Sequence, residues 1–294
     1  MTWFRDIAVL LFLPVFGYCQ SSREIIISLG DIPPAKLAAA NRNKLSEVNV
    51  APLIDRRYID PNHDEIIDSA HLANSIKALY SGSKVKYGLL DWESKDFEHL
   101  INCDTSDARF QVAMSKYLKL LAIAKAVQPD VKWGFYALPY RSYWKLDSIE
   151  RINNKLIPLL KECDVLLPSL YSYYPNGTPF SHNEKYFKTN ITESLRIGDS
   201  LNKPVLAFVW HRWHDSNKKV GMQLIPPDEF RQYLRWILDA SYNTKKVDGI
   251  VWFGVEVYYY PSRQESSNAR FAESHRYYKV LREEMRRTPE NTRK

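Results

Sequence analysis

The chain has 294 residues, which is long enough for one large α/β domain or for two ordinary ones. Its formal net charge of +7 fits either simple solubility or an affinity for polyanions such as an acidic polysaccharide. The lysines and arginines are scattered and form no nucleic-acid-binding motif, so we expect no nucleic-acid partner.

The first element in chain order is an apolar run, Ile7–Phe16, that follows a basic residue and is too short to span a bilayer. This pattern is typical of a secretory signal, residues 1–19, with cleavage before Gln20. A lipid anchor at Cys19 is disfavoured, because Tyr18 is bulky where such signals need a small residue. We therefore expect a secreted or periplasmic protein with no integral membrane segment after cleavage.

Short apolar runs then alternate with amphipathic stretches. The candidate strands are Glu24–Leu29, Val48–Ile54, Val85–Trp92, Val131–Ala137, Asp164–Pro168, Val205–Trp210 and Gly249–Phe253. The candidate helices span 64–81, 106–128, 146–162, 183–201, 226–242 and 265–287. Strands separated by helices predict βαβ units and a parallel sheet.

Seven such strands, with no glycine-rich phosphate loop after the first, favour a closed barrel over a dinucleotide-binding sheet. The predicted fold is a distorted TIM-like (β/α) barrel of about seven parallel strands, formed by one domain over residues 20–288. Residues 289–294 are expected to be a disordered tail.

The most informative stretch ends the third candidate strand with Asp91-Trp92-Glu93. Side chains alternate along a strand, so Asp91 and Glu93 are expected on one face, about 6.5 Å apart at the backbone. The C-terminal ends of barrel strands form the mouth where active sites are built. Two acids there suit cleavage of a glycosidic bond, which needs one protonated and one charged carboxyl group. The alternative is a pair of solvated acids at the start of a helix.

Aromatic residues gather at the C-terminal ends of four successive candidate strands. Flat rings with a polar handle suit the apolar faces of sugars and the hydroxyls around them. Each ring alone is equally explained by core or rim packing, whereas their recurrence favours a carbohydrate pocket. The candidate substrate-binding residues are Tyr136, Tyr140, Phe208, Trp210, Trp213 and Trp252.

The spacing of the two acids also favours one mechanism. A double-displacement glycosidase needs its two carboxyl groups on opposite sides of the scissile bond, and neighbours on one strand do not easily flank it. They suit a substrate-assisted route, in which the acetamido group of an N-acetylhexosamine attacks its own anomeric carbon. Glu93 would act first as general acid and then as base, while a charged Asp91 would orient the acetamide and keep the proton on Glu93.

Residues 85 to 256 resemble the hyaluronidases of glycoside hydrolase family 56. Asp91-Trp92-Glu93 is similar to the acid pair of that family, and Trp133–Tyr140 is similar to its Trp-Gly-Tyr-Tyr segment. Asp164–Tyr171 and Gly249–Trp252 resemble two further strands of its barrel.

The resemblance implies Glu93 as proton donor and Asp91 as its partner. It also implies that Tyr171 is a catalytic residue that touches the acetamido group and that Trp252 lines the same pocket. The family barrel is distorted and has seven strands, and the implied substrate is a glycosaminoglycan, hyaluronan or chondroitin.

Two positions depart from the family. Asp96 stands about where the family has an arginine, and Phe208 stands where a tyrosine is common. Positive charge for a uronate would then come from Lys95, Arg141 or Arg212.

Two other classes stay open: a chitinase-like barrel glycosidase, and a lectin-like barrel that binds glycans without turnover. The chitinase-like signature carries two further aspartates upstream, where this chain has Lys86 and Leu89. The intact acid pair argues against a lectin.

No cofactor is expected. A metal site is not supported, because His211 and His214 have no further candidate ligands near them in the sequence. Cys103 and Cys163 leave open one disulfide in an oxidising compartment.

Overall fold

The computed structural model describes residues 23–29, 49–81, 85–253 and 265–287. The predicted signal segment 1–19 and the tail 289–294 lie outside the described residues. In the described part, six parallel strands form one curled sheet in the order β4-β3-β2-β1-β8-β5. These strands are β1 (Glu24–Leu29), β2 (Asn49–Ile54), β3 (Tyr87–Leu90), β4 (Lys132–Phe135), β5 (Leu206–Trp210) and β8 (Gly249–Phe253).

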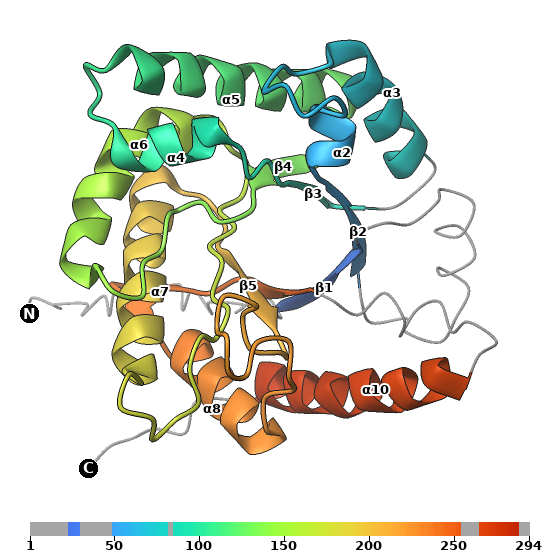
Figure 1. The fold of residues 1–294 in the computed structure, drawn as a ribbon, viewed down its shortest axis with the longest axis vertical. Coiled ribbons are helices and arrows are strands. Elements are labelled where there is room, and N and C mark those ends of the chain that lie inside the picture. The colour runs from blue at the N-terminus through green and yellow to red at the C-terminus, as the bar shows by residue number, and fades with distance from the viewer. Residues whose placement is uncertain (1–22, 30–48, 82–84, 254–264, 288–294) are drawn as a thin grey trace, which may run out of the picture.

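Helices surround the curled sheet (Figure 1). They are α2 (Arg56–Ile59), α3 (Ser69–Tyr80), α4 (Lys95–Asn102), α5 (Ala108–Val127), α6 (Ile149–Glu162), α7 (Asn183–Leu201), α8 (Pro227–Leu238) and α10 (Glu265–Arg286), with a 3₁₀ turn η1 (Leu146–Ser148) before α6. A small hairpin, β6 (Ser241–Tyr242) and β7 (Lys245–Lys246), replaces the last turn of the helix predicted over 226–242. The mixed α/β fold of a distorted barrel predicted from the sequence is thereby confirmed.

The predicted strand Asp164–Pro168 is not a continuous strand, although its backbone occupies the place of one. The Leu167 N–H donates to the Leu138 carbonyl at 2.8 Å, on the β4 side. On the β5 side, Leu206 N–H donates to the Leu166 carbonyl at 2.9 Å. Pro168 has no N–H to donate, so the ladder is reduced to isolated bridges.

This segment approaches β4 closely because β4 carries a glycine. A Cβ atom at Gly134 would lie 2.3 Å from the Val165 carbonyl oxygen, which real side chains do not tolerate. Glycine at this position therefore lets the bridging segment 164–169 join β4 to β5 and complete the ring.

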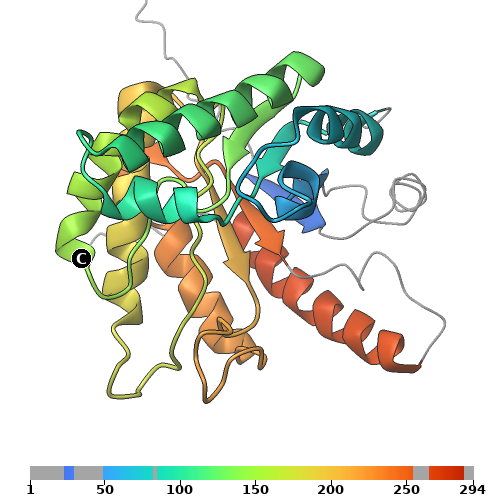
Figure 2. The same cartoon turned by 45° about the horizontal axis from the view of Figure 1, so that its top comes forward.

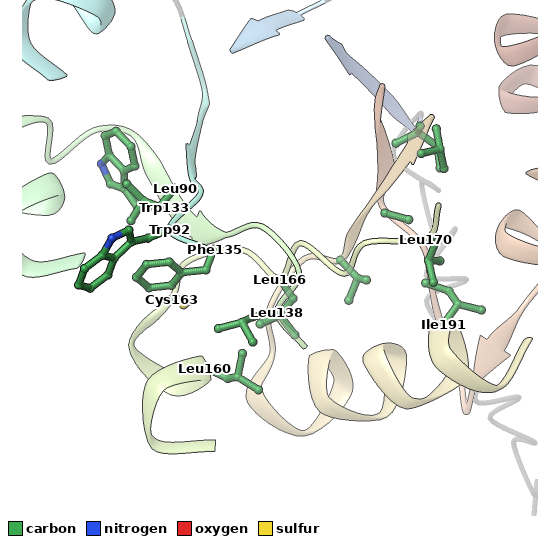
Figure 3. Close-up of a cluster of buried hydrophobic side chains, with 14 of the residues drawn as sticks. Leu90, Trp92, Trp133, Phe135, Leu138, Leu160, Cys163, Leu166, Leu170 and Ile191 are labelled. Atoms are coloured by element: carbon green, nitrogen blue, oxygen red, sulfur yellow. The ribbon is translucent and has the colours of Figure 1, made fainter. Parts of the chain in front are cut away.

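Side chains alternate between two cores. One core fills the inside of the barrel and includes Leu89, Leu167, Phe208 and Val251. The other lies between the strands and the helices, where Trp92, Trp133 and Phe135 pack with Leu160 of α6 (Figure 3). The position of a side chain along its strand thus decides whether it faces the barrel or the helices.

Two further features bear on the sequence-based expectations. Cys103 and Cys163 are buried and both are free thiols, so no disulfide joins them. Among the helices of the described residues, none is long and apolar enough to cross a membrane.

Candidate active site

A cavity of about 250 Å³ opens at the C-terminal ends of the strands. Its lining includes six of the site residues predicted from the sequence: Asp91, Glu93, Tyr136, Tyr171, Phe208 and Trp210. Four more complete the wall: Leu53, His214, Asp215 and Phe253. The loops that follow the bridging segment and β5 lie at the end of the barrel toward which the arrowheads of β5 and β8 point (Figure 2).

The two acids face this cavity because the chain stays extended after β3. The Asp91 N–H continues the ladder to β2 and donates to the Ile54 carbonyl at 2.9 Å. Trp92 turns the other way, and its ring stacks on Tyr117 of α5 with centroids 5.5 Å apart. With Trp92 fixed in the outer core, alternation directs Asp91 and Glu93 to the same side.

Asp91 is the more deeply placed carboxyl group. Its Oδ1 is buried and has no hydrogen-bond partner. Burial raises the pKa of Asp91 well above its usual range, and the nearby charges of Glu93 and Asp55 raise it further. These surroundings therefore favour the protonated form of Asp91.

Glu93 lies at the mouth of the cavity and is exposed to solvent. Partial desolvation raises the pKa of its carboxyl group, Arg141 lowers it, and Asp215 raises it. Water reaches Glu93, which limits the size of the rise. The sequence predicts a charged Asp91 beside a protonated Glu93, whereas in the structure burial acts more strongly on Asp91 and favours its protonated form.

Five aromatic rings enclose the cavity. Tyr136 meets Phe208 edge-on with centroids 5.0 Å apart, and Tyr171 stacks on Phe253 at 5.9 Å with an interplanar angle of 23°. Trp210 contacts both Tyr171 and Phe253 at 5.6 Å. Such a lining keeps Asp91 out of water and offers apolar surface to a sugar ring.

The hydroxyl groups of Tyr136 and Tyr171 belong to this aromatic lining. Ser169 Oγ donates to the Tyr136 hydroxyl at 3.2 Å. Burial raises the pKa of Tyr171 well above its usual range, and the neighbouring Tyr136 raises it further. Both tyrosines therefore remain neutral near pH 7 and are available as hydrogen-bond donors.

Three predicted substrate-binding residues lie elsewhere. Trp252 is fully buried in the outer core, because its neighbours Val251 and Phe253 take the barrel-facing positions of β8. Trp213 is buried in the same outer core. Tyr140 also packs there, and its backbone N–H donates to Asn153 Oδ1 at 2.7 Å. None of these three is among the residues that line the cavity.

Trp252 is instead expected to contribute to stability. Its Nε1 donates to His211 Nδ1 at 3.2 Å, and its ring stacks on Tyr278 of α10. Trp252→Phe should lower the free energy of unfolding by about 1–2 kcal/mol through the lost hydrogen bond and volume. Thermal unfolding and hydrolysis rates measure this: the melting temperature should fall by a few degrees while kcat/KM stays unchanged. A loss of kcat/KM without loss of stability would show that Trp252 takes part in substrate binding.

The candidate cations differ in their surroundings. Arg212 is engaged by an ion pair with Glu273 and by the Met222 carbonyl. Lys95 is exposed at the first turn of α4, outside the cavity lining. Arg141 is also outside the cavity lining, but its charge is near enough to lower the pKa of Glu93, and its Cζ lies 5.2 Å from the centroid of the Tyr173 ring.

Asp96, which stands where the resembled family has an arginine, does not face the cavity. It is buried against α5, and its Oδ2 accepts from Lys116 Nζ at 2.6 Å. Its charge is therefore neutralised within the fold and does not oppose an anionic ligand.

Several lining residues were not predicted as such. Phe253 follows Val251 by two positions, so strand alternation was a usable signal for it. His214 and Asp215 come from the loop after β5, where no periodicity indicates orientation. No group of three or more metal-ligating side chains is present among the described residues.

Comparison with known proteins gave one short sequence match and distant structural ones. No protein-family model matches the chain. The chain is 31% identical over 84 residues to hyaluronidase conohyal-P1 of Conus purpurascens. That match covers 29% of this chain and 18% of the hyaluronidase, so it spans less than a fifth of that protein's length.

Among solved structures, cellobiohydrolase II of Humicola insolens is similar with a TM-score of 0.43 and 14% identity, over 75% of this chain and 69% of that one. A family 39 glycoside hydrolase from Bacteroides cellulosilyticus has a TM-score of 0.35 and 10% identity, over 80% and 57% of the two chains. Thiamine phosphate pyrophosphorylase of Pyrococcus furiosus has a TM-score of 0.36 and 12% identity, over 90% of this chain and 98% of that one. These likenesses are too low to carry a functional argument.

Proposed function

We propose that the protein is a secreted, retaining endo-glycosidase that hydrolyses N-acetylhexosamine linkages in a glycosaminoglycan such as hyaluronan or chondroitin. The observation that carries the proposal is the placement of Asp91 and Glu93 in one aromatic-lined cavity at the barrel mouth. The partial sequence likeness to a cone snail hyaluronidase supports the choice of substrate.

In the first step, the acetamido oxygen of the substrate attacks C1 of its own sugar and the C1–oxygen bond to the next sugar breaks. Glu93, which lies at the mouth, gives its proton to the departing oxygen. The positive charge that develops on the acetamido group lies against the carboxylate of Asp91, which is already ionised when the proton is on Glu93 and stabilises that charge.

In the second step, Glu93 removes a proton from a water molecule that adds to C1. The ring formed by the acetamide opens, the acetamido group is restored, and the sugar keeps its original configuration. Glu93 is left protonated, ready for the next cycle.

The first step needs one proton and one negative charge on the acid pair, and the second step restores them. The surroundings of the buried Asp91 carboxyl favour the proton there, as its raised pKa indicates. An acetamide N–H hydrogen-bonded to Asp91 would favour the ionised form and leave the shared proton to Glu93.

The proposal is tested with size-defined oligomers of hyaluronan, chondroitin and chitin. We expect cleavage within the glycosaminoglycan chain and products that keep the anomeric configuration, seen by NMR immediately after cleavage. Oligomers with their N-acetyl groups removed should bind but not be cleaved, because they lack the nucleophile. Cleavage of the deacetylated oligomers would contradict the substrate-assisted step.

Arg141 is expected to select acidic substrates. Its positive charge is near enough to Glu93 to lower the pKa of that carboxyl group, and among the described residues no ion pair joins it to a carboxylate. Arg141→Gln should lower kcat/KM on hyaluronan about tenfold, the loss of one charge-assisted hydrogen bond. The effect on neutral chitin oligomers should be smaller, and added salt should weaken hyaluronan binding less in the variant than in the wild type. Equal losses on both substrates would show that Arg141 acts only through the acid pair and does not select acidic substrates.

A further inference from the structure

A group of aromatic side chains lies on the rim of the barrel mouth, outside the cavity. This rim platform comprises Tyr143 and Trp144, from the loop after β4, and Tyr174 and Phe180, from the loop before α7. Trp144 is 61% exposed and Phe180 is 60% exposed. Large apolar rings are seldom left in water side by side without a ligand to cover them.

A continuous path of ring contacts joins the platform to the cavity. His214, which lines the cavity, stacks on Tyr173 with centroids 4.6 Å apart and an interplanar angle of 25°. Tyr173 contacts Tyr143 at 5.3 Å, and Tyr143 contacts Trp144 at 5.1 Å. Because Tyr143 is buried, this path runs beneath the surface and fixes the platform against the wall of the cavity.

The platform is held rigidly by polar contacts beneath it. The Tyr143 hydroxyl accepts from the His182 backbone N–H at 3.1 Å and lies 3.0 Å from Asn183 Oδ1. Asn183 Nδ2 in turn donates to the Tyr174 carbonyl at 2.7 Å. A surface whose rings are already fixed loses little conformational entropy when a ligand stacks on it.

We infer that the rim platform is a distal subsite, on which a pyranose ring of the same polysaccharide stacks several units away from the scissile bond. The inference rests on the proposed function and extends it. Trp144 and Phe180 offer the flat faces, and the hydroxyl of Tyr174 offers a polar handle, which is the combination that sugar rings require.

Continuity with the cavity favours a sugar chain over a protein partner. Tyr173 stacks on His214 of the cavity wall and is followed in the chain by Tyr174 of the platform, so cavity and platform belong to the same mouth of the barrel. A stable protein interface needs about 800 Å² on each partner. Two exposed rings beside a cleft are suited to one or two sugar units instead.

The test compares Trp144→Ala with wild type on hyaluronan oligomers of increasing length. The ratio of kcat/KM on long polymers to kcat/KM on the shortest cleaved oligomer should fall about five- to tenfold, because the short oligomer does not reach the rim. Phe180→Ala should give a smaller fall in the same ratio, and Trp144→Phe should restore most of it. Ile66→Ala, which removes an equally exposed apolar side chain elsewhere, is the matched control and should leave the ratio unchanged.

Binding is measured separately, by calorimetry with long hyaluronan on a Glu93→Gln background. Adding Trp144→Ala should weaken binding of the long chain by a similar factor. A ratio and a long-chain affinity that both stay unchanged would overturn the inference, and the platform would then be a protein-contact surface. If no glycan is cleaved or bound by the wild type, the proposed function itself fails, which is a distinguishable result.

Discussion

Glu93→Gln is expected to lower kcat/KM on hyaluronan about 10³- to 10⁴-fold, the loss associated with removal of a general acid that also serves as base. Gln cannot give or take the proton, but it keeps the size and hydrogen-bonding ability of the side chain. Substrate affinity should therefore change little. Glu93 is exposed, so the melting temperature should also stay within about one degree of the wild type.

The matched control for this variant is Glu98→Gln, an exposed glutamate on α4 that lies outside the cavity lining. It should retain full activity. Substrates with a leaving group of low pKa, such as a nitrophenyl glycoside, need little proton donation, so the loss in Glu93→Gln should shrink on them. A loss of equal size on both kinds of substrate would contradict the role of general acid.

The same variant separates the enzyme from a lectin-like barrel. If the wild type binds size-defined glycans without cleaving them, Glu93→Gln will have no rate to lower and the barrel is a binding module. Activity that survives the substitution would place the acid elsewhere in the cavity. Asp215 also lines the cavity and lies close enough to Glu93 to raise its pKa, so it would then be the next candidate.

Much of the fold was predictable because buried strands and helices appear in the sequence as local patterns of apolar residues. β1 and β8 begin and end at the predicted residues, since both are short apolar runs bounded by polar or turn residues. The segment 164–168 was also located correctly, but its hydrogen bonds depend on Pro168 and on the approach to Gly134. Those are tertiary features that apolar periodicity does not encode.

The site was predictable where strand alternation determines orientation. It brought Asp91 and Glu93 to one side, and it would also have favoured Phe253 over Trp252. The resemblance to a family favours Trp252 instead, which the alternation along β8 directs to the outer core. Loop residues such as His214 gave no comparable signal, since their orientation depends on contacts with Tyr173 and Ser172 from another loop.

Asp91→Asn is expected to lower kcat about 10²- to 10³-fold while KM changes less than about threefold. The charge of Asp91 is needed when positive charge develops on the acetamide, so its loss weakens the transition state more than the bound substrate. The two effects are separated by steady-state kinetics on hyaluronan oligomers. Equal losses in affinity and in turnover would instead make Asp91 a substrate-binding residue.

The same substitution should stabilise the fold, and the gain should depend on pH. Burial raises the pKa of Asp91 in the folded protein above its value of about 3.9 in the unfolded chain. As the pH rises from about 4 toward that raised pKa, the unfolded chain ionises first, so the wild type loses stability relative to the variant, whose amide side chain does not titrate. The melting temperature of Asp91→Asn minus that of the wild type should therefore grow with pH and then level off. If this difference in melting temperature stays constant from about pH 4 to pH 8, ionisation of Asp91 does not destabilise the fold. The pKa of Asp91 would then not be raised, which would contradict the proton assignment within the acid pair.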